Sequence, residues 1–514
     1  MTGSIKMTNR KRFFLNGILL TAVGLAIRSV SLGFNSYVTH SIGAEGIGLF
    51  TLISTVYSFA VTFATSGISL TVTRLVSSAI GEGREKEVKG ILRSAVCYSL
   101  IFSLFASLVL FFGADYFGIK VLSDERTVVP LRILSASLVP IAMSSVFSGY
   151  FVGVKRVGRN AAVQVLGQIF KICITVYFVV NFAHLGVEAG TVALCISSTL
   201  TEISVFLIAL IEFLWDKRKK LTRERGENRH FSSVSGMALP LAVSAYIRSA
   251  LLTFEHILIP KRLRDRGESH TEALASYGIL HGMALPMLLY PMAPLTSFSG
   301  LLVPEFSESM ARGERERMQR IASEALNTTL VYSIAAMVFI SLFSEELGYV
   351  VYDSYDAGHY IAMMAPVLPI MYLDHVSDSM LKGIGEHVYS MWVNISDSFL
   401  SIILVWVLIP RMGIMGYAVV IVVMEGYNFM LSAIRLYSKI KFKIHILRSV
   451  IIPLAAAAFA AVISKKLFIR CGEMTEPVWL FCEILFAVCA FLTVYFTISL
   501  LSEKTFKLRN NKAL

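Results

Sequence analysis

Runs of about 20 apolar residues recur along the whole chain, separated by short polar segments. A run of this length, wound as a helix, crosses the roughly 30 Å hydrocarbon core of a membrane. Charged residues make up 16% of the chain, against about 25% in a typical soluble domain. The sequence therefore predicts an all-α polytopic membrane protein, because a helix satisfies its own backbone hydrogen bonds in lipid.

Fourteen candidate transmembrane spans can be drawn. The first run is longer than the apolar region of a signal peptide, and no small-residue cleavage site closes it. We therefore interpret it as a helix and not as a cleaved leader. The spans are 13–38, 46–78, 88–113, 129–153, 160–182, 187–214, 233–260, 273–303, 321–344, 357–381, 387–410, 413–437, 446–469 and 476–501.

The distribution of basic residues predicts the orientation of these spans. With a cytoplasmic N-terminus, most of the 47 Lys and Arg residues fall in cytoplasmic segments, and an even number of spans returns the C-terminus to the same side. One external cluster, KRLRDR at 261–266, departs from this rule. The net charge of +12 is explained by loops that face anionic lipid headgroups. No nucleic-acid partner is therefore expected.

The chain contains an internal repeat. TAVGLAIRSVSLGFN at 21–35 aligns without a gap on LAVSAYIRSALLTFE at 241–255. Further pairs of similar segments are 65–88 with 296–318, 139–153 with 368–383, and 185–190 with 412–416. Spans 1–6 and 7–12 therefore form two copies in the same order and orientation, which predicts a pseudo-two-fold axis along the membrane normal and a cavity between the copies.

A polar stretch at 215–230 separates the two copies, and we interpret it as a cytoplasmic linker. We predict an N-terminal six-helix lobe with this linker at 1–228 and a C-terminal six-helix lobe at 229–440. The last two spans and a cytoplasmic tail, at 441–514, have no counterpart in the repeat.

Arg28 and Arg248 occupy the same repeat position inside spans 1 and 7. An arginine at the centre of a helix in lipid costs about 2.5–3.5 kcal/mol on insertion scales, so it usually faces a cavity or a partner. Ser31 and Asn35 follow Arg28 on one helical face, as Glu255 follows Arg248. Two guanidinium groups facing one cavity would form a phosphate site. The alternatives are snorkelling to the interface or a structural ion pair.

Glu255 has no acidic counterpart, because Asn35 takes its place in the first copy. It could couple transport to an ion or proton, or act as counter-ion to Arg248. Asp374 and Asp378, one helical turn apart in span 10, could bind a coupling cation. Weaker candidates for cavity lining are Lys171, Glu202, His281, Asp397 and Glu425.

Motifs of enzyme chemistry are missing from the sequence. It has no G-x-x-x-x-G-K-[ST] phosphate loop and no H-E-x-x-H, and its six cysteines form no C-x-x-C or Cys/His cluster. We therefore expect neither an enzyme nor a metal site. No cofactor is expected, with transport driven by Na⁺, H⁺ or the membrane potential.

Two long segments resemble a known family. GIGLFTLISTVYSFAVTFATSGISLTVTRLVS at 46–77 and SYGILHGMALPMLLYPMAPLTSFSGLLVPEFSESMARG at 276–313 resemble the stage V sporulation protein B and polysaccharide-biosynthesis branch of the multidrug/oligosaccharidyl-lipid/polysaccharide exporter (MOP) superfamily. The resemblance implies two six-helix lobes around a V-shaped cavity with alternating access. It also implies that Arg28 and Arg248 match cavity arginines of lipid II flippases, and that spans 13 and 14 shape a groove for a lipid tail.

The resulting hypothesis is a flippase of the bacterial cytoplasmic (inner) membrane with both termini in the cytoplasm. Its substrate would be a polyprenyl-pyrophosphate-linked sugar, either an oligosaccharide or a peptidoglycan precursor. Membrane lipids and cell-envelope synthases would be its partners, and the resemblance links its branch to sporulation. The alternatives are a cation-coupled exporter of the multidrug and toxin extrusion type and a non-transporting scaffold for envelope synthesis.

Overall fold

The structure is a computed structural model that describes residues 3–65, 67–154, 156–216, 229–469, 482–495 and 497. Helices account for nearly all of these residues, and the described ranges contain no strand. The α-helices are α1 Gly3–Thr65, α2 Ile68–Gly81, α3 Val88–Phe112, α4 Val128–Ser135, α5 Leu138–Gly153, α6 Val157–Phe182, α7 Val187–Leu214, α8 Arg229–Asp265, α9 His270–Gly278, α10 Leu285–Leu289, α11 Ala293–Ala311, α12 Arg315–Leu342, α13 Ser344–Tyr352, α14 Tyr355–Met364, α15 Leu368–Gly383, α16 His387–Met412, α17 Ile414–Lys439 and α18 Ile452–Ile469.

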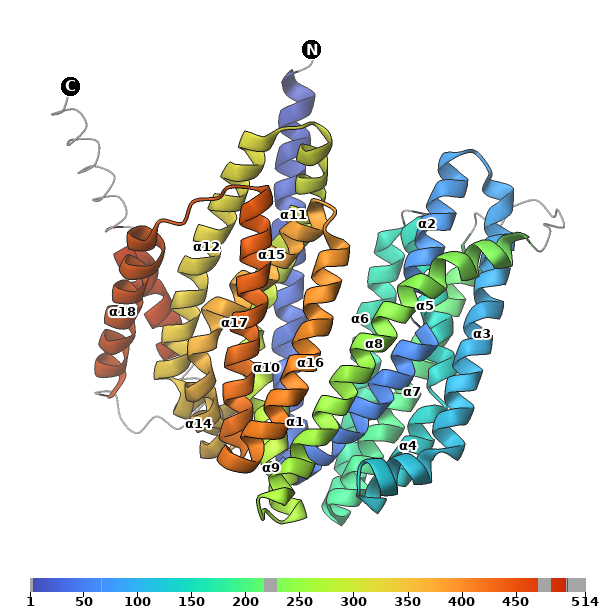
Figure 1. Ribbon diagram of the computed structural model, residues 1–514, viewed down its shortest axis with the longest axis horizontal. Coiled ribbons are helices and arrows are strands. Elements are labelled where there is room, and N and C mark those ends of the chain that lie inside the picture. Colours follow the sequence, from blue (N-terminus) through green and yellow to red (C-terminus); the bar gives the residue numbers. More distant parts are fainter. Residues whose placement is uncertain are drawn as a thin grey trace. The chain divides into compact units, whose positions relative to one another are not determined.

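Short 3₁₀ and π-helical turns join many of these helices. The 3₁₀ turns are Glu85–Glu87, Glu125–Thr127, Ala183–Leu185, Tyr290–Met292 and Ala365–Val367, and the π-helical turns are Tyr116–Val121, Ile279–Ala284 and Leu447–Ile451. A further apolar helix covers Cys482–Tyr495. Figure 1 shows the helices running mostly along one common direction within each compact unit of the chain.

Ten helices of the described chain are long and apolar enough to cross a membrane, or eleven if the bent pair Glu125–Ser135 and Leu138–Gly153 is one span. The predicted polytopic helical fold is therefore confirmed. The predicted count of fourteen stays a prediction, because spans 1 and 2 run together in α1, span 10 is divided into α14 and α15, and part of span 14 lies outside the described residues.

Glycines at positive φ mark the breaks in the first long helix. Gly43 (φ 73°, ψ 175°) kinks α1, and Gly67 (φ 75°) separates α1 from α2. Glycine adopts this left-handed backbone region without the steric cost that a Cβ would add. At Gly67 a Cβ would also lie 2.5 Å from the carbonyl oxygen of Ala238 in α8, so glycine also permits this close approach.

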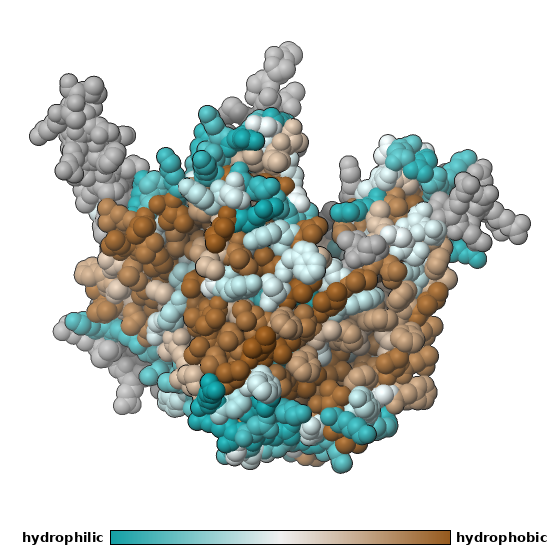
Figure 2. Space-filling model, viewed as in Figure 1, coloured by the Kyte–Doolittle hydropathy of each residue, from teal (hydrophilic) through white to brown (hydrophobic). Residues whose placement is uncertain are grey.

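The chain divides by its contacts into two compact units. Unit 1 comprises residues 1–40, 279–404 and 411–514, and unit 2 comprises 41–278 and 405–410. The lobe boundaries predicted from the linker and the repeat stay a prediction. On the face that Figure 2 draws, apolar side chains lie along the middle of the helices of each unit and polar side chains lie towards their ends, as expected for helices that cross a membrane.

Each unit has its own apolar core. In unit 2, α5 packs against α2, α3 and α7, and α6 packs against α7. The core there includes Val72, Val146 and Phe151, all fully or almost fully buried. In unit 1, α15 packs against α11, α12 and α17, around a core that includes Phe306 and Met380.

The same local contact occurs in both units at corresponding repeat positions. Ser77 Oγ donates to the Gly153 carbonyl at 3.1 Å, and Ser307 Oγ donates to the Gly383 carbonyl at 2.8 Å, each across 76 residues. Both glycines face a close neighbouring helix, where a Cβ would lie 3.0 Å or less from another heavy atom. Small residues at such positions let helices approach closely in a membrane.

Backbone conformation repeats as well. The only two non-glycine residues with positive φ among the described residues are Ser123 (59°) and Asp353 (51°), which hold matching places before α4 and α14. Gly83 and Gly313, in the matching polar loops, also agree, with φ of 73° and 69°. These pairs extend the internal repeat from sequence to local structure.

Candidate functional site

The two repeat arginines lie in different units. Arg28 is on α1 in unit 1, and its side chain lies outside the part of the structure that is described. Arg248 is on α8 in unit 2, where its side chain is exposed. Three hydrogen bonds fix α8 on both sides of Arg248: Tyr246 Oη to Phe63 O (3.1 Å), Ser249 Oγ to Thr62 Oγ1 (3.3 Å) and Thr253 Oγ1 to Thr55 O (3.3 Å). The described part of the chain provides no ion pair for Arg248, so its guanidinium remains available to an anion.

Glu255 has a different environment from Arg248, although their spacing predicted a shared face. It is only 6% exposed. It interacts electrostatically with Tyr277 of α9, which packs against α8 at this level. The neighbouring His256 Nδ1 lies 2.9 Å from the Tyr277 hydroxyl. The cover that α9 provides therefore separates Glu255 from the exposed face that carries Arg248.

Asn35 and Ser31 lie on α1 in unit 1. Asn35 Nδ2 donates to the Gly282 carbonyl at 2.9 Å. Gly282 belongs to the π-helical turn Ile279–Ala284. A π-turn departs from the usual α-helical hydrogen-bond pattern and is frequent at functional sites. Asn35 therefore ties α1 to the start of span 8, and Ser31 is half-buried one turn before it.

Three carboxylates of unit 1 interact within the predicted membrane region. Asp374 on α15 interacts electrostatically with Asp397 on α16, and Glu425 on α17 interacts with both. One carboxylate oxygen of Asp374 is buried without a hydrogen-bond partner. Asp378, the other predicted coupling residue, instead forms an ion pair with Lys382 at 2.5 Å. Asp374 is therefore the predicted aspartate that interacts with both Asp397 and Glu425, whereas Asp378 is paired with Lys382.

An apolar pocket of about 730 Å³ lies in unit 1. Residues of α1, α12, α13 and the helix Cys482–Tyr495 line it, together with the turn Tyr290–Met292. Its lining is almost wholly aliphatic or aromatic and includes Leu32, Phe339, Phe343, Leu485 and Phe491. A pocket of this kind excludes charged groups and fits a hydrocarbon chain.

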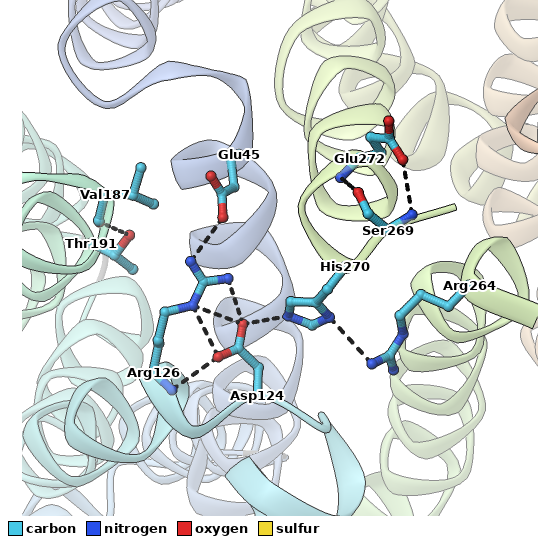
Figure 3. A network of polar contacts seen from close by, with 9 residues as sticks. All are labelled: Glu45, Asp124, Arg126, Val187, Thr191, Arg264, Ser269, His270 and Glu272. Atoms are coloured by element: carbon cyan, nitrogen blue, oxygen red, sulfur yellow. Dashed lines mark hydrogen bonds and ion pairs between the residues drawn. The ribbon is translucent and has the colours of Figure 1, made fainter. Parts of the chain in front are cut away.

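A polar cluster of unit 2 joins α1, the turn before α4 and the α8–α9 connection (Figure 3). This Asp124 cluster consists of Glu45, Asp124, Arg126, Arg264 and His270. Arg126 donates to both Asp124 and Glu45 at 2.8 Å. His270 Nε2 lies 2.7 Å from Asp124, and Arg264 lies 3.2 Å from His270 Nδ1. Because Arg264 can only donate, the geometry favours a His270 that accepts at Nδ1 and donates from Nε2.

The electrostatics of this cluster favour an ionised Asp124. Burial alone would raise the pKa of Asp124, but hydrogen bonds from Arg126 and His270 hold the pKa of this carboxyl below its usual range. The cluster also gives a structural role to part of the basic segment at 261–266, which departs from the predicted charge rule. Arg264 of this segment contacts His270, and His270 contacts Asp124, so the α8–α9 connection is tied to the segment before α4.

Sequence reasoning missed the Asp124 cluster. Asp124 and His270 are 146 residues apart, and no motif links them. The only available signal was the basic segment at 261–266 itself, which marks where the second repeat copy differs from the first.

Comparison with known proteins identifies related sequences. A family described as polysaccharide biosynthesis protein matches residues 14–310, more than half of the chain. A second family, described as MatE, matches residues 267–407. Stage V sporulation protein B of Bacillus subtilis (strain 168) is 28% identical over 420 residues, which cover 80% of this chain and 81% of that protein. Lipid II flippase MurJ of the same organism is 22% identical over 412 residues, which cover 73% and 74%.

Solved structures have the same fold. Lipid II flippase MurJ in an inward closed conformation matches with a TM-score of 0.70 at 14% identity, covering 94% of this chain and 100% of that chain. An inward-facing multidrug resistance MATE family transporter of the MOP superfamily matches with a TM-score of 0.66 at 16% identity, covering 81% and 98%. The superfamily resemblance inferred from the sequence is therefore confirmed at the level of the fold.

Proposed function

The chain belongs to the polysaccharide biosynthesis protein family, and we propose that it is a flippase for a polyprenyl-pyrophosphate-linked sugar. The substrate would be an oligosaccharide or a peptidoglycan precursor that crosses the bacterial cytoplasmic membrane by alternating access. Two relatives carry names that support this class: the lipid II flippase MurJ and stage V sporulation protein B, both of Bacillus subtilis.

The duplicated arginine is the observation that carries the proposal. Arg28 and Arg248 hold the same position in the two repeat copies, inside apolar spans. Arg248 is exposed and has no ion pair in the described chain. Such a residue in a membrane span normally serves a cavity or a pathway. Guanidinium groups bind phosphate oxygens through two parallel hydrogen bonds, so the pyrophosphate is the part of the substrate that they would hold.

The apolar pocket of unit 1 provides a place for the lipid tail. Its volume of about 730 Å³ and its aliphatic and aromatic lining fit part of a polyprenyl chain. The helix Cys482–Tyr495, which lies outside the repeat, forms one wall. The additional C-terminal spans would thus distinguish this protein from exporters of water-soluble compounds, because such compounds have no hydrocarbon tail that the exporter must bind.

Coupling to an ion or proton is proposed for the carboxylates of unit 1. Asp374, Asp397 and Glu425 repel one another when all are ionised, and the surrounding apolar helices give them little solvation. A bound proton or Na⁺ would relieve this repulsion. Binding can drive transport only if its affinity differs between the inward-open and outward-open states. Glu255 remains a second coupling candidate, and the membrane potential is an alternative source of energy.

The remaining assignments belong to the same proposal. Both termini would lie in the cytoplasm, as the excess of basic residues in alternate loops predicts. Transport of this kind breaks no covalent bond, so the protein would not be an enzyme. Synthases of the cell envelope would supply the substrate or consume it on the other side.

A second candidate function is a cation-coupled multidrug exporter. The MatE match to residues 267–407 favours it. Purified protein in liposomes would be supplied with a fluorescent polyprenyl-pyrophosphate sugar and, separately, with a fluorescent organic cation. We expect translocation of the lipid-linked sugar only. Transport of the cation without the lipid would favour the exporter, and transport of neither would favour a non-transporting scaffold.

A further inference from the structure

Unit 2 contains a small polar pocket that is separate from the features described above. Its volume is about 220 Å³, and it lies where α2, α5, α6 and α7 meet. Helices that cross a membrane rarely place so many polar groups together unless these groups have a function. The polar side chains that line it include Ser69, Ser144, Ser148, Asn160, Gln164 and Glu202.

Several of these groups lack partners within the protein. The Ser144 hydroxyl is buried and has no hydrogen bond. Among the described residues, the side chains of Ser148, Asn160 and Gln164 also form no hydrogen bond. A buried polar group without a partner is unfavourable, which applies to the Ser144 hydroxyl. Asn160 is half-buried and Gln164 is exposed, so both carboxamides can be reached by a ligand. A polar solute that enters the pocket would supply donors and acceptors to these groups.

The chemistry of the lining favours a neutral ligand over a cation. Glu202 of α7 is the only carboxylate that lines the pocket. It interacts electrostatically with Lys171 of α6, which lies two turns after Gln164 on that helix. The other polar groups are hydroxyls and carboxamides, which both donate and accept. Hydroxyls of a sugar match this set, and the carboxamides of Asn160 and Gln164 are complementary to an N-acetyl group.

The size of the pocket fits a single sugar ring. At about 30 Å³ per water molecule, 220 Å³ corresponds to roughly seven waters. This volume is too small for a sugar together with its pyrophosphate, so the pyrophosphate must be bound elsewhere. Arg248 is the residue of the same unit that we assign to it.

Arg248 and the pocket belong to elements of unit 2 that pack together. Ser249, next to Arg248 on α8, donates to Thr62 Oγ1 of α1. The helix α2, which contributes Ser69 to the pocket, also packs against α8. Pyrophosphate and first sugar are adjacent groups of one headgroup, which agrees with their binding to packed elements of the same unit.

We propose that this pocket binds the sugar attached to the pyrophosphate, and that this sugar is N-acetylated. The inference rests on the proposed flippase function. Arg248 binds the pyrophosphate, while Asn160 and Gln164 form hydrogen bonds with the acetamido group and the ring hydroxyls. The pocket is thus the part of the site that distinguishes a loaded lipid carrier from an empty one.

The test compares two lipids on the full-length purified protein. One is a short-chain polyprenyl pyrophosphate, and the other is the same lipid carrying N-acetylglucosamine. Equilibrium binding of each is measured for the wild type, for the double variant Asn160→Ala/Gln164→Ala, and for Asn181→Ala. Asn181 is the matched control, because it lies on the same helix outside the pocket and donates to the Tyr177 carbonyl of its own helix.

We expect the wild type to bind the sugar-bearing lipid about tenfold more tightly than the bare lipid, since one to two hydrogen bonds are worth about 1.4 kcal/mol together. The double variant should lose this preference and keep its affinity for the bare lipid, and Asn181→Ala should behave as the wild type.

Four results would overturn the inference. A double variant that keeps the preference, or a wild type that binds both lipids equally, excludes the sugar pocket and leaves the flippase proposal intact. A double variant that loses affinity for both lipids equally indicates that Asn160 and Gln164 have a structural role. A wild type that binds neither lipid contradicts the proposed function itself.

Discussion

Replacing Asp124 with Asn should destabilise unit 2, because it removes the charge at the centre of the Asp124 cluster. The carboxylate is 5% exposed and accepts from Arg126 at 2.8 Å and from His270 at 2.7 Å. Asn has nearly the same shape, so the substitution changes the charge and leaves the packing almost unaltered. It leaves the Arg126 guanidinium partly buried with Glu45 as its remaining partner.

Asp124→Asn should lower the free energy of unfolding by about 3 kcal/mol. Breaking a buried ion pair by removing one partner costs roughly 3–5 kcal/mol, and the lower end applies because Arg126 keeps Glu45 and is itself 28% exposed. For a unit of this size, about 3 kcal/mol lowers the melting temperature by roughly 6–12 °C.

The loss should also depend on pH. The pKa of Asp124 is held below its usual range, so its contribution to stability is fully present above pH about 4, the value for an unfolded Asp. This contribution disappears as the pH falls through the lowered pKa. The difference in melting temperature between wild type and Asp124→Asn should therefore persist from pH 8 to pH 5 and shrink below pH about 4.

Thermal unfolding in detergent, followed by circular dichroism at several pH values, measures both effects. Asp115→Asn is the matched control, because Asp115 forms a 2.6 Å ion pair with Arg132 but is 57% exposed. Exposed ion pairs are worth roughly 0–1 kcal/mol. If Asp124→Asn destabilises the protein no more than Asp115→Asn does, the reasoning about this cluster is wrong.

Two further predictions concern packing and coupling. Gly149→Ala should lower the free energy of unfolding by about 1–3 kcal/mol, because the new methyl group would lie 2.5 Å from the Ser69 carbonyl oxygen. The control Gly300→Ala, whose Cβ would have no atom within 4 Å, should leave the melting temperature unchanged or raise it slightly. Equal melting temperatures of the two variants would contradict the packing argument. Asp374→Asn should alter how the flipping rate depends on pH and Na⁺, whereas Asp378→Asn should not, because Asp378 is already paired with Lys382. Initial flipping rates in liposomes with imposed pH and Na⁺ gradients measure this dependence. An unchanged dependence in Asp374→Asn would remove Asp374 as a coupling residue.

The fold was largely predictable because its determinants are local in sequence. Apolar runs of membrane-spanning length specify the helices, and segments such as 139–153 and 368–383 revealed the repeat before any contact was known. The structure then showed matching backbone conformations at Ser123 and Asp353. Neither position could have been selected from residue type alone, because serine and aspartate adopt a positive φ in only a small fraction of cases, even though aspartate does so more often than most residues.

The candidate site was predictable only in part. The duplicated arginines were visible because the repeat aligns them, but the burial of Glu255 depends on how α9 packs over α8. The polar pocket draws on four helices, and its members have no common spacing in the sequence. Sites of this kind arise from packing between distant segments, which hydrophobic periodicity does not encode.

The central prediction is that transport of the substrate needs each of the two repeat arginines, Arg28 and Arg248, as a ligand of the pyrophosphate. The most direct measurement is the initial rate at which purified protein in liposomes flips a fluorescent polyprenyl-pyrophosphate sugar. The rates of Arg28→Ala, Arg248→Ala and Arg93→Ala would be compared with that of the wild type. Arg93 is an exposed arginine of unit 2 outside the repeat pair, without an ion pair among the described residues.

A hydrogen bond to a charged group contributes about 1.5–3 kcal/mol, which corresponds to roughly a tenfold to hundredfold change in rate if the contact is made in the transition state. We predict a loss of this size in each of the two repeat variants and wild-type flipping in Arg93→Ala. Flipping by both repeat variants at the wild-type rate would contradict the account.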